Sequence, residues 1–318
     1  MKIKKLGLVG YKKKEISFFK KKFKKFDIID ITDKNFFKSS SLDINALVVL
    51  YEWPVKKNLS SFLSQKYKKF KNLDWLHLSR AGIDECLPYM KNYNFTFTSG
   101  KKIQGPNVSE HCLALLLILT RGLLSLDRKE YFLRPTEIKD KKILILGFGG
   151  IGSEIAKKLF AFGARVDTVN TSKVTSKYVK KNYKLANLKK IVKNYEIVIN
   201  NLPLTSKTKN LFDKNIFNKM NKKCFFINIS RDQTIKMNDL KKIIKEKKFL
   251  GVGIDNTGSF KMNKKIIYDS KSNFVLTDHQ AGISTNLYRR RKNLIFENLK
   301  NYYSKKKMNY LVSKKKEY

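Results

Sequence analysis

The chain has 318 residues, enough for two domains with separate hydrophobic cores, and its 42% hydrophobic residues exclude a disordered protein. The formal net charge of +43 would suit a nucleic-acid-binding protein, but only nine of the 69 basic residues are arginines, and the lysines are spread over every segment. We therefore expect a solvated lysine surface and no specific nucleic-acid partner, because arginine makes most bidentate phosphate and base contacts.

Residues 1–100 alternate short apolar runs with lysine-rich amphipathic stretches. The apolar runs predict strands at Ile3–Val9, Phe26–Ile31, Ala46–Tyr51, Leu73–Leu78 and Phe95–Thr98. The amphipathic stretches predict helices such as Glu15–Phe26 and Leu59–Phe70. His77 alternates with apolar neighbours and is expected to be packed. Strands that alternate with helices predict a parallel sheet with helices on both faces.

A second alternating series begins after residues 105–107. It starts with an apolar helix at Val108–Leu126 and ends with a helix at Asn286–Tyr303. Between them, strands are predicted at Ile143–Leu146, Arg165–Val169, Ile197–Asn200, Cys224–Ile229, Leu250–Ile254 and Phe274–Leu276. The chain therefore predicts an α/β fold with two doubly wound parallel sheets.

Neither a membrane span nor a metal site is expected. The longest apolar run, Cys112–Leu119, is far too short to cross a bilayer, and the amino-terminal residues lack the apolar stretch of a signal peptide. The three cysteines, Cys86, Cys112 and Cys224, include no Cys-x-x-Cys pair. This usage argues against a disulfide framework or a zinc site and suits the reducing cytoplasm.

A glycine-rich segment lies between a predicted strand and a predicted helix. Gly147-Phe148-Gly149-Gly150-Ile151-Gly152 follows Ile143–Leu146 and opens the helix Ser153–Phe162, in the pattern G-x-G-x-x-G. The first glycine of such a pattern permits a tight turn, the second lets the backbone approach a pyrophosphate, and the third allows close packing of helix on strand. We therefore predict a dinucleotide site at Gly147, Gly149, Gly150, Ile151 and Gly152, with the anion at the helix N-terminus.

The end of the next predicted strand bears on the choice of cofactor. Dinucleotide sites of this kind usually carry an acidic residue about twenty positions further on, which bonds the ribose hydroxyls. Here Arg165–Val169 is followed by Asn170-Thr171-Ser172-Lys173, without a carboxylate. Asn170 beside a lysine tolerates a 2′-phosphate, so NADP is slightly favoured over NAD. Alternatively, Asn170 caps the strand and still bonds ribose.

Six further segments occur in order along the chain. They are Ser79-Arg80-Ala81-Gly82-Ile83-Asp84, Gly105–Gly122, Asn201-Leu202-Pro203-Leu204-Thr205 with Thr208, Ile227-Asn228-Ile229-Ser230-Arg231, Gly251-Val252-Gly253-Ile254-Asp255, and Leu276-Thr277-Asp278-His279-Gln280-Ala281-Gly282. With these segments, residues from about Leu73 to Asn286 resemble the D-isomer-specific 2-hydroxyacid dehydrogenases. That family includes glyoxylate/hydroxypyruvate reductases, phosphoglycerate dehydrogenases and D-lactate dehydrogenases.

The resemblance implies two domains and a set of cofactor contacts. Residues 105–283 would form a Rossmann NAD(P)-binding domain, and residues 1–104 with 284–318 a discontinuous, flavodoxin-like substrate domain, with the substrate in the cleft between them. Beyond the glycine loop, the implied cofactor-binding residues are Asn170, Leu202, Pro203, Thr208, Ile229, Ser230, Asp255, His279 and Gly282. A homodimer is also implied, because the run Leu113–Leu119 is too apolar for a solvent-exposed position.

The same resemblance implies hydride transfer between a nicotinamide cofactor and a small 2-oxo or D-2-hydroxy acid. The planar fork of Arg231 would bind the substrate carboxylate and carbonyl, and His279 would exchange the proton with the substrate oxygen. Backbone N–H groups around Ala81 and Gly82 would bind the other carboxylate oxygen. Arg80 is a further candidate substrate contact, with a surface position as the alternative.

The pattern departs from that of the family in three places. Phe260 stands where the family has the glutamate that pairs with the histidine, Asp232 replaces a glycine, and Asp278 replaces the usual proline. A neighbouring carboxylate raises the pKa of a histidine and fixes its tautomer, so its loss is expected to slow reduction. A dinucleotide-binding protein of the same fold with altered catalysis is therefore the alternative function.

Overall fold

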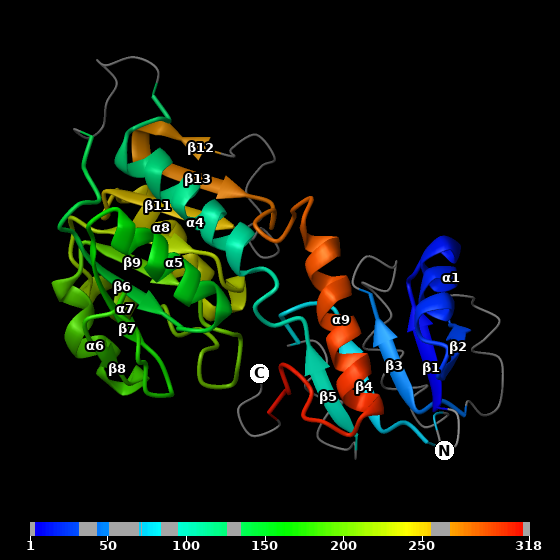
Figure 1. The fold of residues 1–318 in the computed structure, drawn as a ribbon. Helices are drawn as coiled ribbons and strands as arrows, with labels where there is room; N and C mark the ends of the chain where they lie inside the picture. Colours follow the sequence, from blue (N-terminus) through cyan, green and yellow to red (C-terminus); the bar gives the residue numbers. More distant parts are fainter. Residues whose placement is uncertain are drawn as a thin grey trace. The chain divides into compact units, whose positions relative to one another are not determined.

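The computed structural model describes residues 4–31, 43–50, 70, 72–83, 95–125, 135–255 and 268–313. The chain divides into two compact units, drawn in Figure 1. Unit 1 comprises Met1–Ile103 and Thr285–Tyr318, and unit 2 comprises Gln104–Ser284. These limits lie within one residue of the boundaries expected from the sequence.

Unit 1 contains a five-stranded parallel sheet in the order β2-β1-β3-β4-β5. Its strands are β1 (Lys4–Val9), β2 (Phe26–Asp30), β3 (Ala46–Val49), β4 (Trp75–Leu78) and β5 (Thr96–Ser99). Each lies within two residues of a predicted strand. This order is the flavodoxin-like doubly wound arrangement, in which the chain leaves the first strand to one side and returns to the other.

Two helices from opposite ends of the chain cover one face of this sheet. They are α1 (Lys13–Lys22) and α9 (Leu287–Tyr303), and Figure 1 shows α9 alongside the strands. Leu6 and Leu8 of β1 point to this face and pack with Phe19 of α1 and Leu299 of α9. The C-terminal helix therefore completes the core of the N-terminal unit, which makes this unit discontinuous in sequence.

Unit 2 contains an eight-stranded sheet in the order β12-β13-β11-β10-β9-β6-β7-β8. The strands are β6 (Lys142–Leu146), β7 (Arg165–Val169), β8 (Asn182–Tyr183), β9 (Ile197–Asn200), β10 (Phe225–Asn228), β11 (Gly251–Asp255), β12 (Tyr268–Asp269) and β13 (Phe274–Thr277). All neighbours pair in parallel except β12 and β13. The strand order reverses between β6 and β9, as in the Rossmann topology. Sheets of this kind bind their ligands at the point of reversal.

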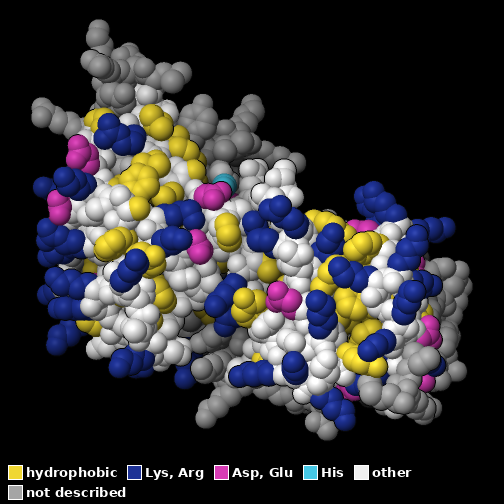
Figure 2. Space-filling view, in the orientation of Figure 1, with side chains coloured by type: hydrophobic (Ala, Val, Ile, Leu, Met, Phe, Trp, Pro, Cys, Tyr) yellow, Lys and Arg dark blue, Asp and Glu magenta, His cyan; other side chains and the backbone are white. Residues whose placement is uncertain are grey.

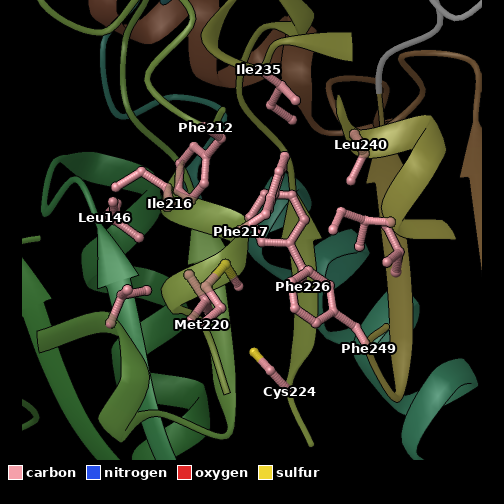
Figure 3. Close-up of a cluster of buried hydrophobic side chains, with 14 of the residues drawn as sticks. Leu146, Phe212, Ile216, Phe217, Met220, Cys224, Phe226, Ile235, Leu240 and Phe249 are labelled. Carbon is pink, nitrogen blue, oxygen red and sulfur yellow. The ribbon is translucent and has the colours of Figure 1, made fainter. Parts of the chain in front are cut away.

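Helices cover both faces of the unit 2 sheet. One face carries α4 (Gly105–Thr120) and α5 (Gly150–Ala161), and the other carries α6 (Leu188–Ile191), α7 (Lys214–Lys219) and α8 (Met237–Lys245). Residues of β6 alternate between the two cores, with Leu144 and Leu146 on one side and Ile143 and Ile145 on the other. Figure 3 shows the side with Leu146, where an aromatic group of Phe212, Phe217 and Phe226 fills the space under α7.

Two helices end several residues earlier than their sequence patterns predict. Helix α1 ends at Lys22 and not at Phe26, because Phe26 already pairs with Lys4 as the first residue of β2. Helix α4 ends at Thr120, two residues before Gly122, whose φ of 66° is the left-handed conformation that commonly terminates helices. The predicted helix Leu59–Phe70 lies outside the described residues, apart from Phe70.

The apolar side chains of α4 pack within unit 2. Cys112, Leu115, Leu116 and Leu119 are all at most 2% exposed and belong to the core formed with β6 and β10. The core of unit 2 thus covers these four side chains of the apolar run. None of the helices in the described part of the chain is long and apolar enough to cross a membrane.

Basic side chains are scattered over the surface. Figure 2 shows Lys and Arg side chains distributed among neutral and hydrophobic ones on the visible face of both units, without a single basic stripe. This distribution fits the solvated lysine surface expected from the sequence. Within the described ranges, no group of His, Cys, Asp and Glu side chains is placed to hold a metal ion.

Candidate active site

The glycine loop connects β6 to α5 as the sequence predicts. Gly147 has a φ of 93°, and a Cβ there would lie 2.7 Å from the carbonyl oxygen of Asn201. A Cβ on Gly152 would collide with the carbonyl oxygen of Gly147. Both positions therefore require glycine, for the tight turn and for close packing of the helix.

The side of this loop at Gly149 is open. A Cβ on Gly149 would meet no atom within 4 Å, so the backbone there is accessible to a ligand. Gly150 and Ile151 lie in the first turn of α5, where the backbone N–H groups have no acceptor within the helix. An open backbone beside a helix N-terminus at the switch point of the sheet fits the pyrophosphate of a dinucleotide.

Asn170, directly after β7, uses its side chain within the protein. Its Oδ1 atom accepts a hydrogen bond from the Phe148 N–H at 3.2 Å, and its Nδ2 atom donates to the carbonyl of Ser172 at 3.1 Å. Asn170 thus ties the glycine loop to the end of β7, as the capping interpretation predicts. Lys184 Nζ lies 2.6 Å from the carbonyl of Thr171 and adds a positive charge that the sequence analysis did not single out.

The loop after β9 is closed by its own hydroxyl groups. Thr208 Oγ1 donates to the carbonyl of Pro203 at 2.6 Å and accepts from the Thr205 N–H at 2.8 Å. Ser230 Oγ, in the loop after the neighbouring strand β10, donates to the carbonyl of Leu202. The expected cofactor-loop residues therefore lie together at the carboxyl ends of β9 and β10, with Ile229 joined to β9 by a backbone hydrogen bond of 3.1 Å.

Arg231 lies three residues beyond β10 and is half-buried. Its carbonyl oxygen accepts hydrogen bonds from Thr234 Oγ1 at 2.6 Å and from the Thr234 N–H at 3.1 Å. The neighbouring Asp232 is buried, and its carboxylate accepts a hydrogen bond from the Gln233 N–H at 2.8 Å. Asp232, which replaces the family glycine, thus uses its carboxylate within the turn that follows Arg231.

Asp255, the last residue of β11, is only 3% exposed and holds the segment that carries His279. Its Oδ1 atom accepts hydrogen bonds from Thr277 Oγ1 at 2.7 Å and the Gln280 N–H at 2.8 Å, and its Oδ2 atom accepts from the Ala281 N–H at 3.1 Å. Charge-assisted bonds of this kind are among the strongest in proteins. Because they attach on both sides of His279, they fix its backbone.

His279 itself is exposed and has a φ of 52°, a left-handed conformation that is uncommon for residues other than glycine. Its N–H donates to the carbonyl of Thr277 at 3.1 Å, which closes a tight turn at the end of β13. Gly282 follows in a close fit, where a Cβ would lie 2.8 Å from the side chain of Gln104. Phe260, at the position of the family glutamate, lies outside the described residues.

Helix α4 supports the same segment from the side. His111 Nε2 lies 2.9 Å from Thr277 Oγ1 and 3.5 Å from Asp255 Oδ1, and Asn107 Nδ2 donates to the carbonyl of Ala281 at 2.7 Å. His111 therefore acts within the protein as a hydrogen-bonding residue. The helix is thus joined to the His279 segment at two points.

The candidate substrate loop of unit 1 follows β4. Arg80, Ala81 and Gly82 are partly exposed, and the N–H groups of Ala81 and Gly82 make no hydrogen bond to other described residues. Arg291 Nε of α9 donates to the carbonyl of Ser79 at 3.0 Å and holds the start of this loop. Within β4, His77 is fully buried beside Thr98, and burial lowers its pKa to about 3.

Sequence reasoning missed three buried polar residues at this edge of unit 2: Asn200, Asn228 and Thr234. Asn200 and Asn228 end the adjacent strands β9 and β10 and are register partners. An asparagine at the end of each of two successive apolar strands is a signal that could have identified them. Hydrogen bonds join the three residues, which a linear pattern does not reveal.

Comparisons with known proteins agree with this geometry. Residues 113–281, about half of the chain, match the family described as D-isomer specific 2-hydroxyacid dehydrogenase, NAD binding domain. The erythronate-4-phosphate dehydrogenase of Wigglesworthia glossinidia brevipalpis is 28% identical over 301 residues, which cover 92% of this chain and 72% of that protein. The glyoxylate reductase of Thermofilum pendens is 26% identical over 204 residues, which cover 60% of each protein.

Solved structures resemble the whole chain. The NADPH-dependent glyoxylate/hydroxypyruvate reductase from Sinorhizobium meliloti, solved in complex with NADP and sulfate, superposes with a TM-score of 0.79. The two proteins are 20% identical, and the match covers 99% of this chain and 100% of that one. The likeness extends over both units and shows a common fold.

Proposed function

Because the chain belongs to the D-isomer specific 2-hydroxyacid dehydrogenase family, we propose that it reduces a small 2-oxo acid to the D-2-hydroxy acid with NADH or NADPH. The observation that carries this proposal is the placement of Arg231 and His279 after β10 and β13, on either side of β11. These strands are parallel, so both residues follow carboxyl ends at the same edge of the sheet. Two strand spacings, about 10 Å, separate the strand axes, which leaves room for a small acid between the side chains.

Each side chain has a separate task in this proposal. Arg231 binds the carboxylate and the adjacent carbonyl through its fork of donors, and His279 delivers a proton to the carbonyl oxygen or removes it in the reverse direction. A bound nicotinamide supplies or accepts the hydride. Asp255 holds the His279 backbone in place through the Gln280 and Ala281 N–H groups. Arg80, Ala81 and Gly82 stay proposed substrate contacts on the basis of the family resemblance.

The cofactor is NAD or NADP, bound at the glycine loop and at the ends of β7 and β9. We propose a preference for NADPH, because Asn170 brings no negative charge to the ribose position and Lys173 and Lys184 bring positive charge. Lys184 supports this assignment through its contact with the Thr171 carbonyl at 2.6 Å. The remaining proposed contacts are Leu202, Pro203, Thr208, Ile229, Ser230, Asp255 and Gly282.

The dehydrogenase function is favoured over the alternative of a dinucleotide-binding protein with altered catalysis, because relatives over most of the chain are named dehydrogenases and reductases. A homodimer and a cytoplasmic location belong to the proposal. The family resemblance supports the first and the three cysteines without a Cys-x-x-Cys pair support the second. Light scattering of the purified protein and cell fractionation test them.

The decisive experiment measures NADH and NADPH oxidation with glyoxylate, hydroxypyruvate, pyruvate and bulkier 2-oxo acids. We expect turnover with at least one of them and its loss in Arg231→Ala. The exposed Glu137→Gln variant of the same unit is the control and should keep wild-type rates. Measurable cofactor binding without turnover of any acid would instead establish the catalytically altered alternative.

A further inference from the structure

Three fully buried polar side chains lie under the proposed site in unit 2. Asn200 ends β9, Asn228 ends β10, and Thr234 lies three residues after Arg231; each is 0% exposed. Buried polar groups are costly unless they are hydrogen-bonded. Their bonds therefore show what the group holds together.

Asn200 is bonded to two different loops. Its Oδ1 atom accepts from the N–H of Leu202, in the proposed cofactor loop, at 3.3 Å. Its Nδ2 atom donates to Thr234 Oγ1 at 2.9 Å and to Asn228 Oδ1 at 2.7 Å. Thr234 Oγ1 in turn donates to the carbonyl of Arg231 at 2.6 Å. A continuous path of hydrogen bonds therefore runs from the cofactor loop to the backbone of the proposed substrate arginine.

A second link joins the same two loops. Ser230 Oγ, next to Arg231, donates to the carbonyl of Leu202. Leu202 is thus held through its N–H by Asn200 and through its carbonyl by Ser230. Displacement of Leu202 must change both bonds, so the two loops are expected to shift together.

Stability alone does not account for this arrangement. The Nδ2 atom of Asn228 is buried and has no hydrogen-bond partner among the residues that the structure describes. An apolar side chain of similar volume would fill the same space without an unmet donor. A role in arranging the loops accounts for an amide at this position.

We propose that Asn200 and Thr234 are positioning residues that couple the two halves of the site, so that a bound dinucleotide strengthens the binding of the 2-oxo acid and the acid strengthens the binding of the dinucleotide. This inference rests on the proposed function. The dinucleotide sets the position of the Leu202 segment, and the hydrogen-bond path transmits that position to the Arg231 backbone. Such coupling is reciprocal, so the same factor must be found in both directions.

The test uses oxamate, an unreactive carboxylate analogue of a 2-oxo acid. Its dissociation constant is measured by calorimetry on the full-length protein, without and with saturating NADH, and the ratio of the two values defines the coupling. We expect a ratio of about ten or more for the wild type and a ratio at least about fivefold smaller for Thr234→Val. Thr234→Ser, which keeps the hydroxyl, should retain the wild-type ratio.

A merely structural role would lower stability without changing this ratio. The stability of each variant is measured by thermal unfolding. If Thr234→Val does not fold, the oxamate ratio is measured on Asn200→Ala instead. A wild-type ratio of one, or a folded Thr234→Val or Asn200→Ala protein with the wild-type ratio, would overturn the coupling and leave the proposed function intact. Failure of the wild type to turn over any 2-oxo acid would remove both.

Discussion

Replacing Asp255 with asparagine changes one atom of the group that holds the His279 segment. Three donors converge on this buried carboxylate: Thr277 Oγ1, the Gln280 N–H and the Ala281 N–H. The asparagine amide offers one acceptor oxygen and one NH₂ group. In either orientation, the NH₂ group faces at least one backbone N–H that then has no acceptor.

The magnitude follows from the number of bonds that are lost. The less costly orientation keeps Thr277 and Gln280 bonded and loses Ala281, a single charge-assisted hydrogen bond worth about 1.5–3 kcal/mol. A loss of about 2 kcal/mol lowers the unfolding temperature of a unit of this size by about 4–8 °C. If the segment opens locally instead, about 2 kcal/mol lowers the ratio of ordered to open segment by about thirtyfold, which is the upper bound on the decrease in kcat/KM.

The assay compares kcat/KM for the 2-oxo acid, the affinity for NADPH and the unfolding temperature of Asp255→Asn with those of the wild type. Cofactor affinity should fall less than kcat/KM, because the glycine loop, on the other side of the strand order reversal, keeps its contacts even if the proposed cofactor contact of Asp255 is weakened. The exposed Glu137→Gln variant makes the same acid-to-amide change and should match the wild type in all three measurements. An Asp255→Asn protein with wild-type kcat/KM and unfolding temperature would refute the positioning role of this carboxylate.

His279→Ala and Arg231→Ala should each lower kcat/KM by about a hundredfold or more, and wild-type rates of NAD(P)H oxidation in either variant would remove that residue from the mechanism. Asn170→Asp should shift preference from NADPH toward NADH, because the carboxylate repels a 2′-phosphate and bonds the ribose. The ratio of the two kcat/KM values measures this shift, and a wild-type preference for NADH of about tenfold, or 1.4 kcal/mol, would contradict the argument. Burial lowers the pKa of His77 to about 3. Between about pH 6.5 and pH 3, His77 is therefore protonated in the unfolded chain and neutral in the folded chain. The free energy of unfolding should therefore decrease by about 2–3 kcal/mol more in wild type than in His77→Gln between pH 7 and pH 4.5; parallel denaturation profiles would contradict it.

Most strands were predictable because their apolar runs are short and bounded by polar residues. Arg165–Val169 and Ile197–Asn200 occur in the structure with the predicted limits. The two-residue strands β8 and β12 were not predicted, since they lie at the two edges of the sheet and form through pairing with a neighbour. A segment of two residues carries no periodicity from which a strand can be recognised.

The candidate site was predictable where its chemistry depends on local backbone. Gly147 and Gly152 are required by a positive φ and a close approach, and such requirements leave glycines in the sequence. Arg231 and His279 were identified by family motifs at strand ends. Their supporting bonds were not: Asp255 was expected as a cofactor contact, and only the structure shows that its carboxylate accepts hydrogen bonds from the Gln280 and Ala281 N–H groups.

The amino-acid sequence alone determined most of the strands, the glycine loop and the family, because these depend on apolar periodicity and on the backbone freedom of single residues. Only the tertiary structure decided which polar groups meet. Asn107 of α4 bonds Ala281, and Asn200 bonds Thr234, across separations of 174 and 34 residues. Such contacts exist only once the order of the strands and the packing of the helices bring distant segments together, because a hydrogen bond requires donor and acceptor to lie within about 3 Å.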